Sequence, residues 1–234
     1  MPAALITGSA KGIGKALALM LAGEGYDVGV HYRTSRREAQ EVAREVEKRG
    51  VNAVTLRADV TDAEQAANLV SEAHARLGQL DVLINNVGNY LFTPLDELEI
   101  DDWHAMFDSN LHSTFYTCRA AVPLMRARGG RIINLGYAGA ELIKARPSIA
   151  AYSIAKTGVI LYSKALAKVE AKHGVTVNVI SPGIVENSVS TPEGLPMGRA
   201  GTFAELTAAA KYLLSPEARY VTGVTLEMAG GWNI

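Results

Sequence analysis

The sequence predicts an α/β fold in which helices cover both faces of one parallel sheet. Three observations lead to this prediction. Short β-rich runs alternate with amphipathic stretches from end to end, several of these runs are almost continuously apolar, and glycines closely follow the helical stretches. Continuous apolar runs are typical of parallel strands that are buried on both faces. Unbroken alternation favours a single doubly wound domain over residues 1–234.

Seven runs are predicted to be strands. Each is short and rich in β-branched or other apolar residues. In chain order they are AALIT (3–7), DVGVHY (27–32), NAVTLRA (52–58), LDVLIN (80–85), GRIINL (130–135), VTVNVI (175–180) and TGVTLEM (222–228). We therefore expect a sheet of about seven strands.

Amphipathic stretches between these runs are predicted to form helices. Asp62 is a suitable N-terminal cap, and Gln65 stands three residues further on, as in a capping box. Gly25, Gly50 and Gly78 each follow a helical stretch closely, as helix-ending glycines do. The predicted helices lie near residues 12–24, 35–49, 62–76, 101–127, 151–172 and 202–214.

The composition argues against several classes of protein. Hydrophobic residues make up 48% of the chain, which is enough for one substantial core. The formal net charge is −1 and no long basic run occurs, so neither nucleic acid nor an anionic membrane is an expected partner. No apolar run reaches the roughly 18 residues that span a bilayer. A strand-like run begins at Ala3, so no signal peptide is expected.

Cysteine and histidine usage favours a cytoplasmic protein without a metal centre. The single cysteine, Cys118, cannot form a disulfide within the chain, which suits a reducing cytosol. The five histidines show no HExxH or comparable spacing, so they are expected to be solvated or packing residues.

A glycine-rich turn follows the first predicted strand and opens the first predicted helix, in LITGSAKGIGKALA. At such a turn the chain must reverse, and the backbone must approach a pyrophosphate more closely than a side chain would allow. Free N–H groups at the start of the helix can bind phosphate oxygens. The predicted dinucleotide-binding residues of this turn are Gly8, Ser9, Lys11, Gly12, Ile13 and Gly14.

The end of the second predicted strand indicates which dinucleotide is bound. An NAD site usually has an acid there for the ribose 2′-hydroxyl, but residues 28–37 contain none. Arg33 instead stands between Tyr32 and Thr34, and a guanidinium with a nearby hydroxyl suits a 2′-phosphate. Ser35, Arg36, Arg37 and Lys11 add hydroxyl or charge nearby. We therefore expect NADP(H), with Arg33 as its main ligand.

Tyr152 and Lys156 are four residues apart in AAYSIAK and share one face of a predicted helix. A free tyrosine has a pKa of about 10, which is too high for efficient proton transfer near neutral pH. A nearby ammonium favours the phenolate, so Lys156 is expected to lower the pKa of Tyr152. This pair is the predicted acid/base centre.

Taken together, these motifs resemble the classical short-chain dehydrogenase/reductase family over essentially the whole chain. Within that family the chain is most similar to 3-oxoacyl-acyl-carrier-protein reductases, and HYRTS after the second strand also resembles pteridine reductases. The segments that carry the resemblance are TGSAKGIG (7–14), ADV (58–60), NNVG (85–88), SNLHSTFY (109–116), YSIAK (152–156), SPG (181–183) and YVTGVTLEMAGGW (220–232).

The resemblance implies further contacts with the cofactor. Asp59 would accept a bond from the adenine amino group, with the Val60 backbone beside it. Asn86 and Gly88 would lie along the ribose side, and Val87 stands where the family usually has alanine. The residues implied to hold the nicotinamide are Pro182, Gly183 and Ile184.

The resemblance also implies the reaction. NADPH would give hydride to a carbonyl carbon while Tyr152 gives a proton to its oxygen. Lys156 would tune Tyr152 and bond the ribose hydroxyls, and Asn110 would hold a water that completes the proton path.

The family's catalytic serine has no counterpart at the usual spacing, because Gly139 stands thirteen residues before Tyr152. Alignment from the strand GRIINL places Tyr137 at the serine's position, fifteen residues before Tyr152, so the loop carries two extra residues. Three interpretations remain open. The hydroxyl of Tyr137 replaces the serine, another group does so, or nothing does. The other groups considered are Ser148, a protonated Glu141 and a backbone N–H near Gly136.

The sequence indicates the substrate-contacting residues less specifically than the cofactor-binding ones. Residues 186–201 are rich in Ser, Pro and Gly and correspond to the substrate-covering loop of the family. Tyr90 and Phe92 are expected to line the same cleft. Two apolar helices, near 101–127 and 151–172, resemble those that the family pairs between subunits, which implies a homotetramer or, failing that, a homodimer.

The sequence thus predicts an NADPH-dependent carbonyl reductase whose substrate is a small molecule or an acyl thioester, with acyl carrier protein as a further partner. A pteridine or other small-carbonyl reductase is the alternative of the same class. A non-catalytic NADP(H)-binding or regulatory protein is the alternative of a different class.

Overall fold

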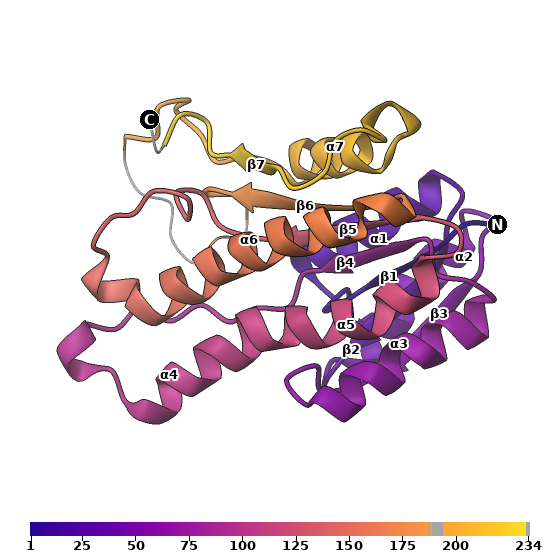
Figure 1. The fold of residues 1–234 in the computed structure, drawn as a ribbon, viewed down its shortest axis with the longest axis horizontal. Helices are drawn as coiled ribbons and strands as arrows, with labels where there is room; N and C mark the ends of the chain where they lie inside the picture. Colours follow the sequence, from indigo (N-terminus) through magenta and orange to yellow (C-terminus); the bar gives the residue numbers. More distant parts are fainter. Residues whose placement is uncertain (187, 189–193, 233–234) are drawn as a thin grey trace.

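One seven-stranded sheet organises the chain, and all of its strand pairs are parallel. The structure is a computed structural model that describes residues 1–186, 188 and 194–232. The strand order is β3-β2-β1-β4-β5-β6-β7, and the arrows of β6 and β7 in Figure 1 point the same way. The strands are β1 (Ala3–Ile6), β2 (Asp27–Tyr32), β3 (Ala53–Arg57), β4 (Val82–Asn85), β5 (Gly130–Leu135), β6 (Val175–Pro182) and β7 (Thr225–Met228). The predicted sheet is therefore confirmed, with seven strands.

Seven α-helices connect and flank these strands. They are α1 (Gly12–Gly23), α2 (Arg36–Glu47), α3 (Ala63–Leu77), α4 (Ile100–Phe107), α5 (Ser113–Met125), α6 (Ala150–Glu170) and α7 (Phe203–Leu214). Short single turns also occur, η1 (Leu95–Glu97), η3 (Pro147–Ile149), η4 (Ala171–His173) and η5 (Pro216–Ala218). No helix in the described part of the chain is both long and apolar enough to cross a bilayer.

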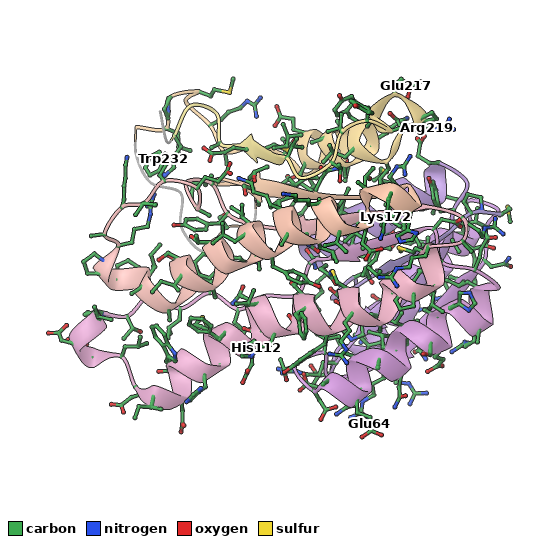
Figure 2. The ribbon with its side chains drawn as sticks, in the orientation of Figure 1. Glu64, His112, Lys172, Glu217, Arg219 and Trp232 are labelled. Carbon is green, nitrogen blue, oxygen red and sulfur yellow. The ribbon has the colours of Figure 1, made fainter. Side chains whose placement is uncertain are left out.

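The predicted helix at 101–127 is interrupted, which the sequence pattern did not indicate. Five residues form a π-helical turn, η2 (Asp108–His112), between α4 and α5. Asn110, at the centre of this turn, is fully buried. His112 extends outward from the same turn, away from the sheet (Figure 2), and bonds Asp108 there. The widened turn thus directs Asn110 inward, and π-turns of this kind often mark functional sites.

Side chains on alternate residues of each strand enter two separate cores, because successive side chains point to opposite faces of a sheet. Ile6 of β1 lies in a core with residues of α1, α2 and α7, such as Leu17 and Leu206. Leu5 of the same strand lies in a core with α3 and α5, including Met125. Helices therefore cover both faces of the sheet (Figure 1), as the continuously apolar runs predict.

The strand order determines where a ligand can enter. The chain winds from β1 toward β3 in one direction, and then passes back across β1 to continue with β4 in the other. The loops that leave β1 and β4 therefore diverge at the carboxyl edge of the sheet, which leaves a crevice between them. The candidate site is built along this edge.

Candidate active site

The carboxyl edge of the sheet brings together the residues that the sequence places after the strands. Gly8 follows β1, Asp59 follows β3 and Gly88 follows β4, while Tyr137 and Gly183 follow β5 and β6. These segments lie far apart in the sequence and meet only because all of the strands are parallel.

The glycine-rich turn has the backbone geometry that its glycines predict. Gly8 and Gly12 have φ angles of 65° and 54°, a region that L side chains rarely adopt. A Cβ at Gly14 would lie 2.3 Å from the carbonyl oxygen of Gly8, so only glycine fits there. Helix α1 begins at Gly12, and its N-cap residue, Lys11, makes no side-chain capping bond. The first N–H groups of α1 therefore remain available to an anion.

Two residues of the turn also contribute to the protein's own structure. Ser9 is fully buried, and its hydroxyl donates to the Ile6 carbonyl and accepts from the N–H of His31. Its own N–H donates to the His31 carbonyl, and the cofactor contact of Ser9 stays a prediction. The side chain of Ile13 packs against the core.

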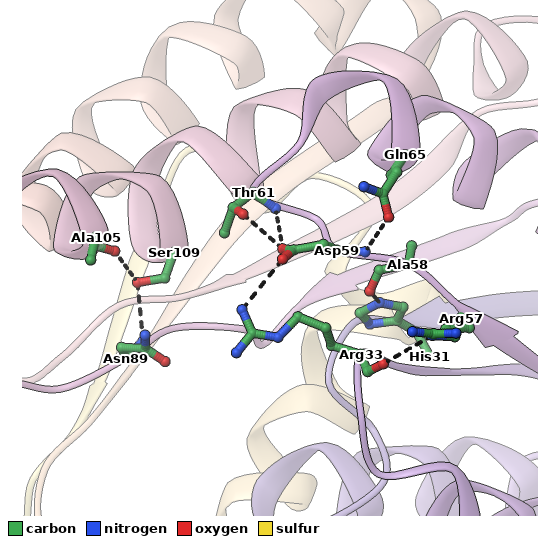
Figure 3. Close-up of polar contacts among 10 residues, drawn as sticks. All are labelled: His31, Arg33, Arg57, Ala58, Asp59, Thr61, Gln65, Asn89, Ala105 and Ser109. Atoms are coloured by element: carbon green, nitrogen blue, oxygen red, sulfur yellow. Dashed lines mark hydrogen bonds and ion pairs between the residues drawn. The ribbon is translucent and has the colours of Figure 1, made fainter.

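His31, which the sequence analysis did not single out, connects three strand ends. Its Nδ1 accepts from the N–H of Gly8 at 2.9 Å, and its Nε2 donates to the carbonyl oxygen of Ala58 at 3.1 Å (Figure 3). This pairing requires the neutral tautomer with the proton on Nε2. Burial lowers the pKa of His31 to about 4, which keeps the ring neutral. A histidine in a strand that is predicted to be buried, next to a glycine turn, was the sequence signal that could have identified this residue.

A cavity of about 430 Å³ opens beside this turn. Arg33 lines it, and its Nη1 lies 3.4 Å from Oδ2 of Asp59 across the cavity (Figure 3). Burial raises the pKa of Asp59, but hydrogen bonds from Thr61 and the charge of Arg33 outweigh it, so that the pKa is lowered. The predicted residues that line the cavity are Gly8, Lys11, Tyr32, Arg33, Thr34, Asp59 and Val60.

The other basic residues near this cavity are directed elsewhere. Lys11 forms an ion pair with Glu38 at 2.7 Å, and Arg37 forms one with Glu41 at 3.1 Å. Neither Arg36 nor Arg37 lines the cavity. Arg33 is thus the guanidinium that the structure places where the second strand ends.

Tyr152 and Lys156 lie together on α6, and Lys156 is buried. The Lys156 Nζ donates to the carbonyl oxygen of Leu135 at 2.7 Å and lies 6.0 Å from the centroid of the Tyr152 ring. Burial lowers the pKa of Lys156 to about 8.

The expected effect of Lys156 on Tyr152 is wrong for the chain by itself. The pKa of Tyr152 is raised, first by burial and then by the neighbouring phenols of Tyr137 and Tyr90. The ammonium is directed at a backbone carbonyl and does not offset these effects. Tyr152 therefore holds its proton firmly at neutral pH.

Asn110 and Gly88 connect the catalytic helix to the crevice. Asn110 Nδ2 donates to the carbonyl oxygens of Asn89 and Met106, while its Oδ1 is buried without a hydrogen-bond partner in the described chain. A Cβ at Gly88 would lie 2.4 Å from this oxygen and 3.2 Å from the Nζ of Lys156. The absence of a side chain at Gly88 therefore lets an unpaired acceptor and an ammonium both lie close to its backbone.

Asn86 and the segment after β6 also help to build the edge. Asn86 Nδ2 donates to the carbonyl oxygens of Thr7 and Gly8, so its amide group braces the glycine turn rather than facing a ribose. Gly183 donates its N–H to Met228, and a Cβ there would lie 2.9 Å from the Cα of Ala229. Pro182, Gly183 and Ile184 do not line the cavity that contains Arg33, which lies several strands away along the same edge.

Tyr137 lies beside Tyr152, with ring centroids 5.2 Å apart. Tyr90 packs edge-on against the same ring at 5.0 Å, so the rings of Tyr90 and Tyr137 both contact that of Tyr152. Phe92, in contrast, is 68% exposed and has no ring contact with them among the described residues. The loop after β5 thus places the ring of Tyr137 beside that of Tyr152.

The other groups considered for the serine's role have different partners. The Gly136 N–H donates to the Ile180 carbonyl, and the Gly139 N–H donates to Glu227. Glu141 pairs with Lys164 on the outer surface. Of Ser148, the structure shows only that its backbone carbonyl accepts from the N–H of Thr93, a bond that does not involve its hydroxyl.

The predicted substrate-covering loop lies partly outside the described residues, which exclude 187 and 189–193. Its described end is fixed to α7, because Arg199 pairs with Glu205, the residue that completes the capping box of that helix with Thr202.

Comparisons with known proteins agree with this geometry. A family model described as Enoyl-(Acyl carrier protein) reductase matches residues 8–233. The 3-oxoacyl-[acyl-carrier-protein] reductase FabG of Staphylococcus aureus (strain Mu50) is 33% identical, over 97% of this chain and 96% of that protein. The chain belongs to the short-chain dehydrogenase/reductase family. It is therefore an oxidoreductase of the class that interconverts alcohols and carbonyls.

Solved structures of short-chain dehydrogenases/reductases superpose on the whole chain. A blue fluorescent protein from a metagenomic library, in complex with NADPH, has a TM-score of 0.93 and 31% identity, and the match covers 100% of this chain and 98% of that one. Acetoin dehydrogenase YohF of Salmonella typhimurium has a TM-score of 0.91 and 30% identity, with 99% and 97% covered.

The residues present fit the nicotinamide cofactor that this family uses. The uncapped amides of α1, the missing Cβ at Gly14 and the cavity at Arg33 suit a dinucleotide at one end of the edge. The unpaired Oδ1 of Asn110 beside Lys156 offers a polar position at the other end. Such a cofactor would supply the hydride, and the side chains around Tyr152 would handle the proton.

Proposed function

We propose that the protein is an NADPH-dependent carbonyl reductase and that its substrate is a 3-oxoacyl thioester. The observation that carries the proposal is the geometry at Tyr152, which lies on α6 with Lys156 and has the ring of Tyr137 5.2 Å from its own. A phenol in this position can donate its proton to a carbonyl oxygen that gains charge during reduction. The carbonyl becomes an alcohol as hydride reaches its carbon and this proton reaches its oxygen.

Three neighbouring residues assist Tyr152 in this proposal. The Lys156 ammonium passes a proton toward Tyr152 and regains one from solvent through a water that the Oδ1 of Asn110 would hold beside Gly88. Tyr137, whose ring lies 5.2 Å from that of Tyr152, donates a second hydrogen bond to the carbonyl oxygen in place of the serine. Losing one such donor costs on the order of 10²–10³ in rate.

The preference for NADPH rests on Arg33. Its guanidinium lines the cavity at the end of β2, where an enzyme that uses NAD would place an acid. Thr34 and Ser35 add hydroxyl groups to the same wall. The NADPH bound by the metagenomic blue fluorescent protein is consistent with this choice.

Similarity to the 3-oxoacyl-[acyl-carrier-protein] reductases supports the thioester as substrate, and with it acyl carrier protein as the partner that delivers it. A small-carbonyl reductase is the second candidate, because the chain also superposes on an acetoin dehydrogenase, with a TM-score of 0.91. The phenols of Tyr90 and Tyr137 at the cleft suit either substrate.

The test is NADPH oxidation by the purified protein with acetoacetyl-CoA, a dihydropteridine and simple ketones, run beside Tyr152→Phe. Turnover with the thioester should vanish in this variant, while its affinity for NADPH stays within about twofold. Tyr137→Phe, which keeps the ring, should lower kcat on the order of 10²-fold. Turnover that survives in Tyr152→Phe would refute the mechanism, and an unchanged kcat in Tyr137→Phe would reject Tyr137 as the donor.

A further inference from the structure

A cation lies over the phenols of the cleft. The guanidinium carbon of Arg146 is 5.6 Å from the centroid of the Tyr137 ring, and that ring is 5.2 Å from the ring of Tyr152. The guanidinium is therefore no further from Tyr152 than the sum of these two distances. Arg146 stands in the loop between β5 and α6, on the carboxyl side of the sheet (Figure 1), just before η3 and the catalytic helix.

The charge of Arg146 is not balanced by an acid within the described chain. Other basic residues near this edge have carboxylate partners, Lys164 with Glu141 and Arg199 with Glu205. The Nε of Arg146, in contrast, is buried and has no hydrogen-bond partner among the described residues. Glu227, an acid whose charge reaches Tyr137, accepts a hydrogen bond from the N–H of Gly139.

The influence of Arg146 extends to the site. Burial raises the pKa of the Tyr137 phenol, and the charge and hydrogen bonding of Arg146 oppose that rise. A positive charge that acts on one cleft phenol also acts on an anion bound beside it. A guanidinium presents a planar fork of N–H donors that matches the two oxygens of a carboxylate, and it remains charged at any pH of an assay.

We propose that Arg146 binds a carboxylate on the substrate, so that the enzyme reduces free oxo acids, a substrate class beyond acyl thioesters. This inference rests on the proposed carbonyl reduction at Tyr152. A 3-oxo acid has its carboxylate only two bonds from the reacting carbonyl carbon, which suits a cation one ring away from Tyr152. The oxo acid gains the hydride at that carbon and the Tyr152 proton at its oxygen, which gives the hydroxy acid and the oxidised cofactor.

The test compares acetoacetate with ethyl acetoacetate, which share the reacting ketone and differ in the carboxylate charge. Arg146→Met, which removes the charge and keeps an apolar stem, should lower kcat/KM for acetoacetate roughly 10- to 100-fold, mainly through KM, because a hydrogen bond to a charged group is lost. The ester should change less than about threefold. Arg146→Lys should retain part of the acetoacetate activity, and Lys144→Met, a neighbouring cation in the same loop, should leave both substrates unchanged.

Binding provides a second readout that does not depend on turnover. Butyrate has the carboxylate without the ketone, and calorimetry with protein saturated with NADPH should detect its binding to the wild type and not to Arg146→Met. Equal losses on acid and ester, or equal butyrate binding by both proteins, would overturn the proposal. If no carbonyl at all is reduced, the proposed function fails, whereas the butyrate titration still decides the anion site.

Discussion

At the scale of single residues, the proposed preference for NADPH rests on one guanidinium. Arg33 lines the cavity beside the glycine turn, while Arg37 pairs with Glu41 and points away from it. Three cations close in sequence are therefore not equivalent, because the start of α2 at Arg36 carries the later two onto the helix.

Arg33→Ala should weaken NADPH binding roughly 10- to 100-fold and NADH binding less than threefold. The variant loses a charge-assisted bond to the 2′-phosphate, which NADH lacks. Dissociation constants for both dinucleotides, measured by the fluorescence of the bound nicotinamide, would show the difference. Arg37→Ala is the matched control and should bind both as the wild type does. Equal weakening of NADPH and NADH in Arg33→Ala would contradict the 2′-phosphate assignment.

His31 is a positioning residue, because it bonds the backbone of the glycine turn and not the cofactor itself. It holds the N–H of Gly8 and the carbonyl of Ala58 in one pair of bonds, and so fixes the turn that would meet the phosphates. His31→Leu keeps a buried apolar group but leaves both backbone groups unpaired, at a cost of about 1–3 kcal/mol each. We expect lower unfolding free energy together with a weaker NADPH complex, measured by urea unfolding and by cofactor titration. His104→Leu, at an exposed histidine, should change neither.

The same residue predicts how stability depends on pH. The folded pKa of His31, about 4, is below the value of about 6.5 expected when it is unfolded, so the unfolded chain binds more protons between these two values. The contribution of His31 is therefore complete above about pH 6.5 and falls, by on the order of 3 kcal/mol, as the pH drops toward 4. Urea unfolding across this range should show a shallower decline in His31→Leu than in the wild type. Parallel declines would exclude His31 as the titrating group.

At the scale of elements, the π-helical turn η2 and the loop after β4 form one unit. The turn directs Asn110 inward, and the missing side chain at Gly88 leaves room for the Oδ1 of Asn110 and the Nζ of Lys156. Both elements are therefore needed to bring this oxygen and this ammonium close together.

Gly88→Ala should therefore impair catalysis more than folding. The new Cβ would lie 2.4 Å from Asn110 Oδ1, so this oxygen or the loop must shift and the arrangement beside Lys156 is disturbed. We expect kcat to fall at least tenfold while the urea midpoint changes little, because Gly88 is exposed on the loop. Gly23→Ala is the control, since nothing lies within 4 Å of its Cβ position in α1. A fully active Gly88→Ala would show that the close approach of Asn110 Oδ1 and Lys156 Nζ to Gly88 has no part in proton transfer.

The helices and strands also show which features of the fold could be predicted from the sequence and which could not. The strands were predictable because buried parallel strands are continuously apolar, and the Asp62 cap of α3 is present as the pattern indicates. The η2 turn was not, since one extra residue in a turn leaves the amphipathic pattern of 101–127 almost intact. The burial of Ser9 and the hydrogen bonds of His31 depend on neighbours from other strands. The raised pKa of Tyr152 depends on burial, which residue spacing does not report.

At the scale of the whole molecule, exposed apolar side chains gather on α6. Ile154, Leu161 and Val169 are 50%, 63% and 57% exposed, and their spacings of seven and eight residues put them on one helix face. Phe115 on the neighbouring α5 is 37% exposed and contacts Tyr162 of α6. An apolar face of this extent on two adjacent helices is typical of a surface that a second copy covers. We propose a homotetramer, or a homodimer, that uses this face.

Leu161→Glu should break this assembly. Two copies of the charge would enter each apolar interface, one from either subunit, and burying an unpaired carboxylate costs several kcal/mol. Light scattering after gel filtration should give the mass of a tetramer or dimer for the wild type and a smaller species for the variant. Leu161→Ala removes apolar area without adding charge and should weaken assembly only in part. Because α6 also carries Tyr152 and Lys156, the dissociated variant should lose kcat as its catalytic helix loses support. A wild type that is monomeric at micromolar concentration would refute the assembly while leaving the active-site proposal intact.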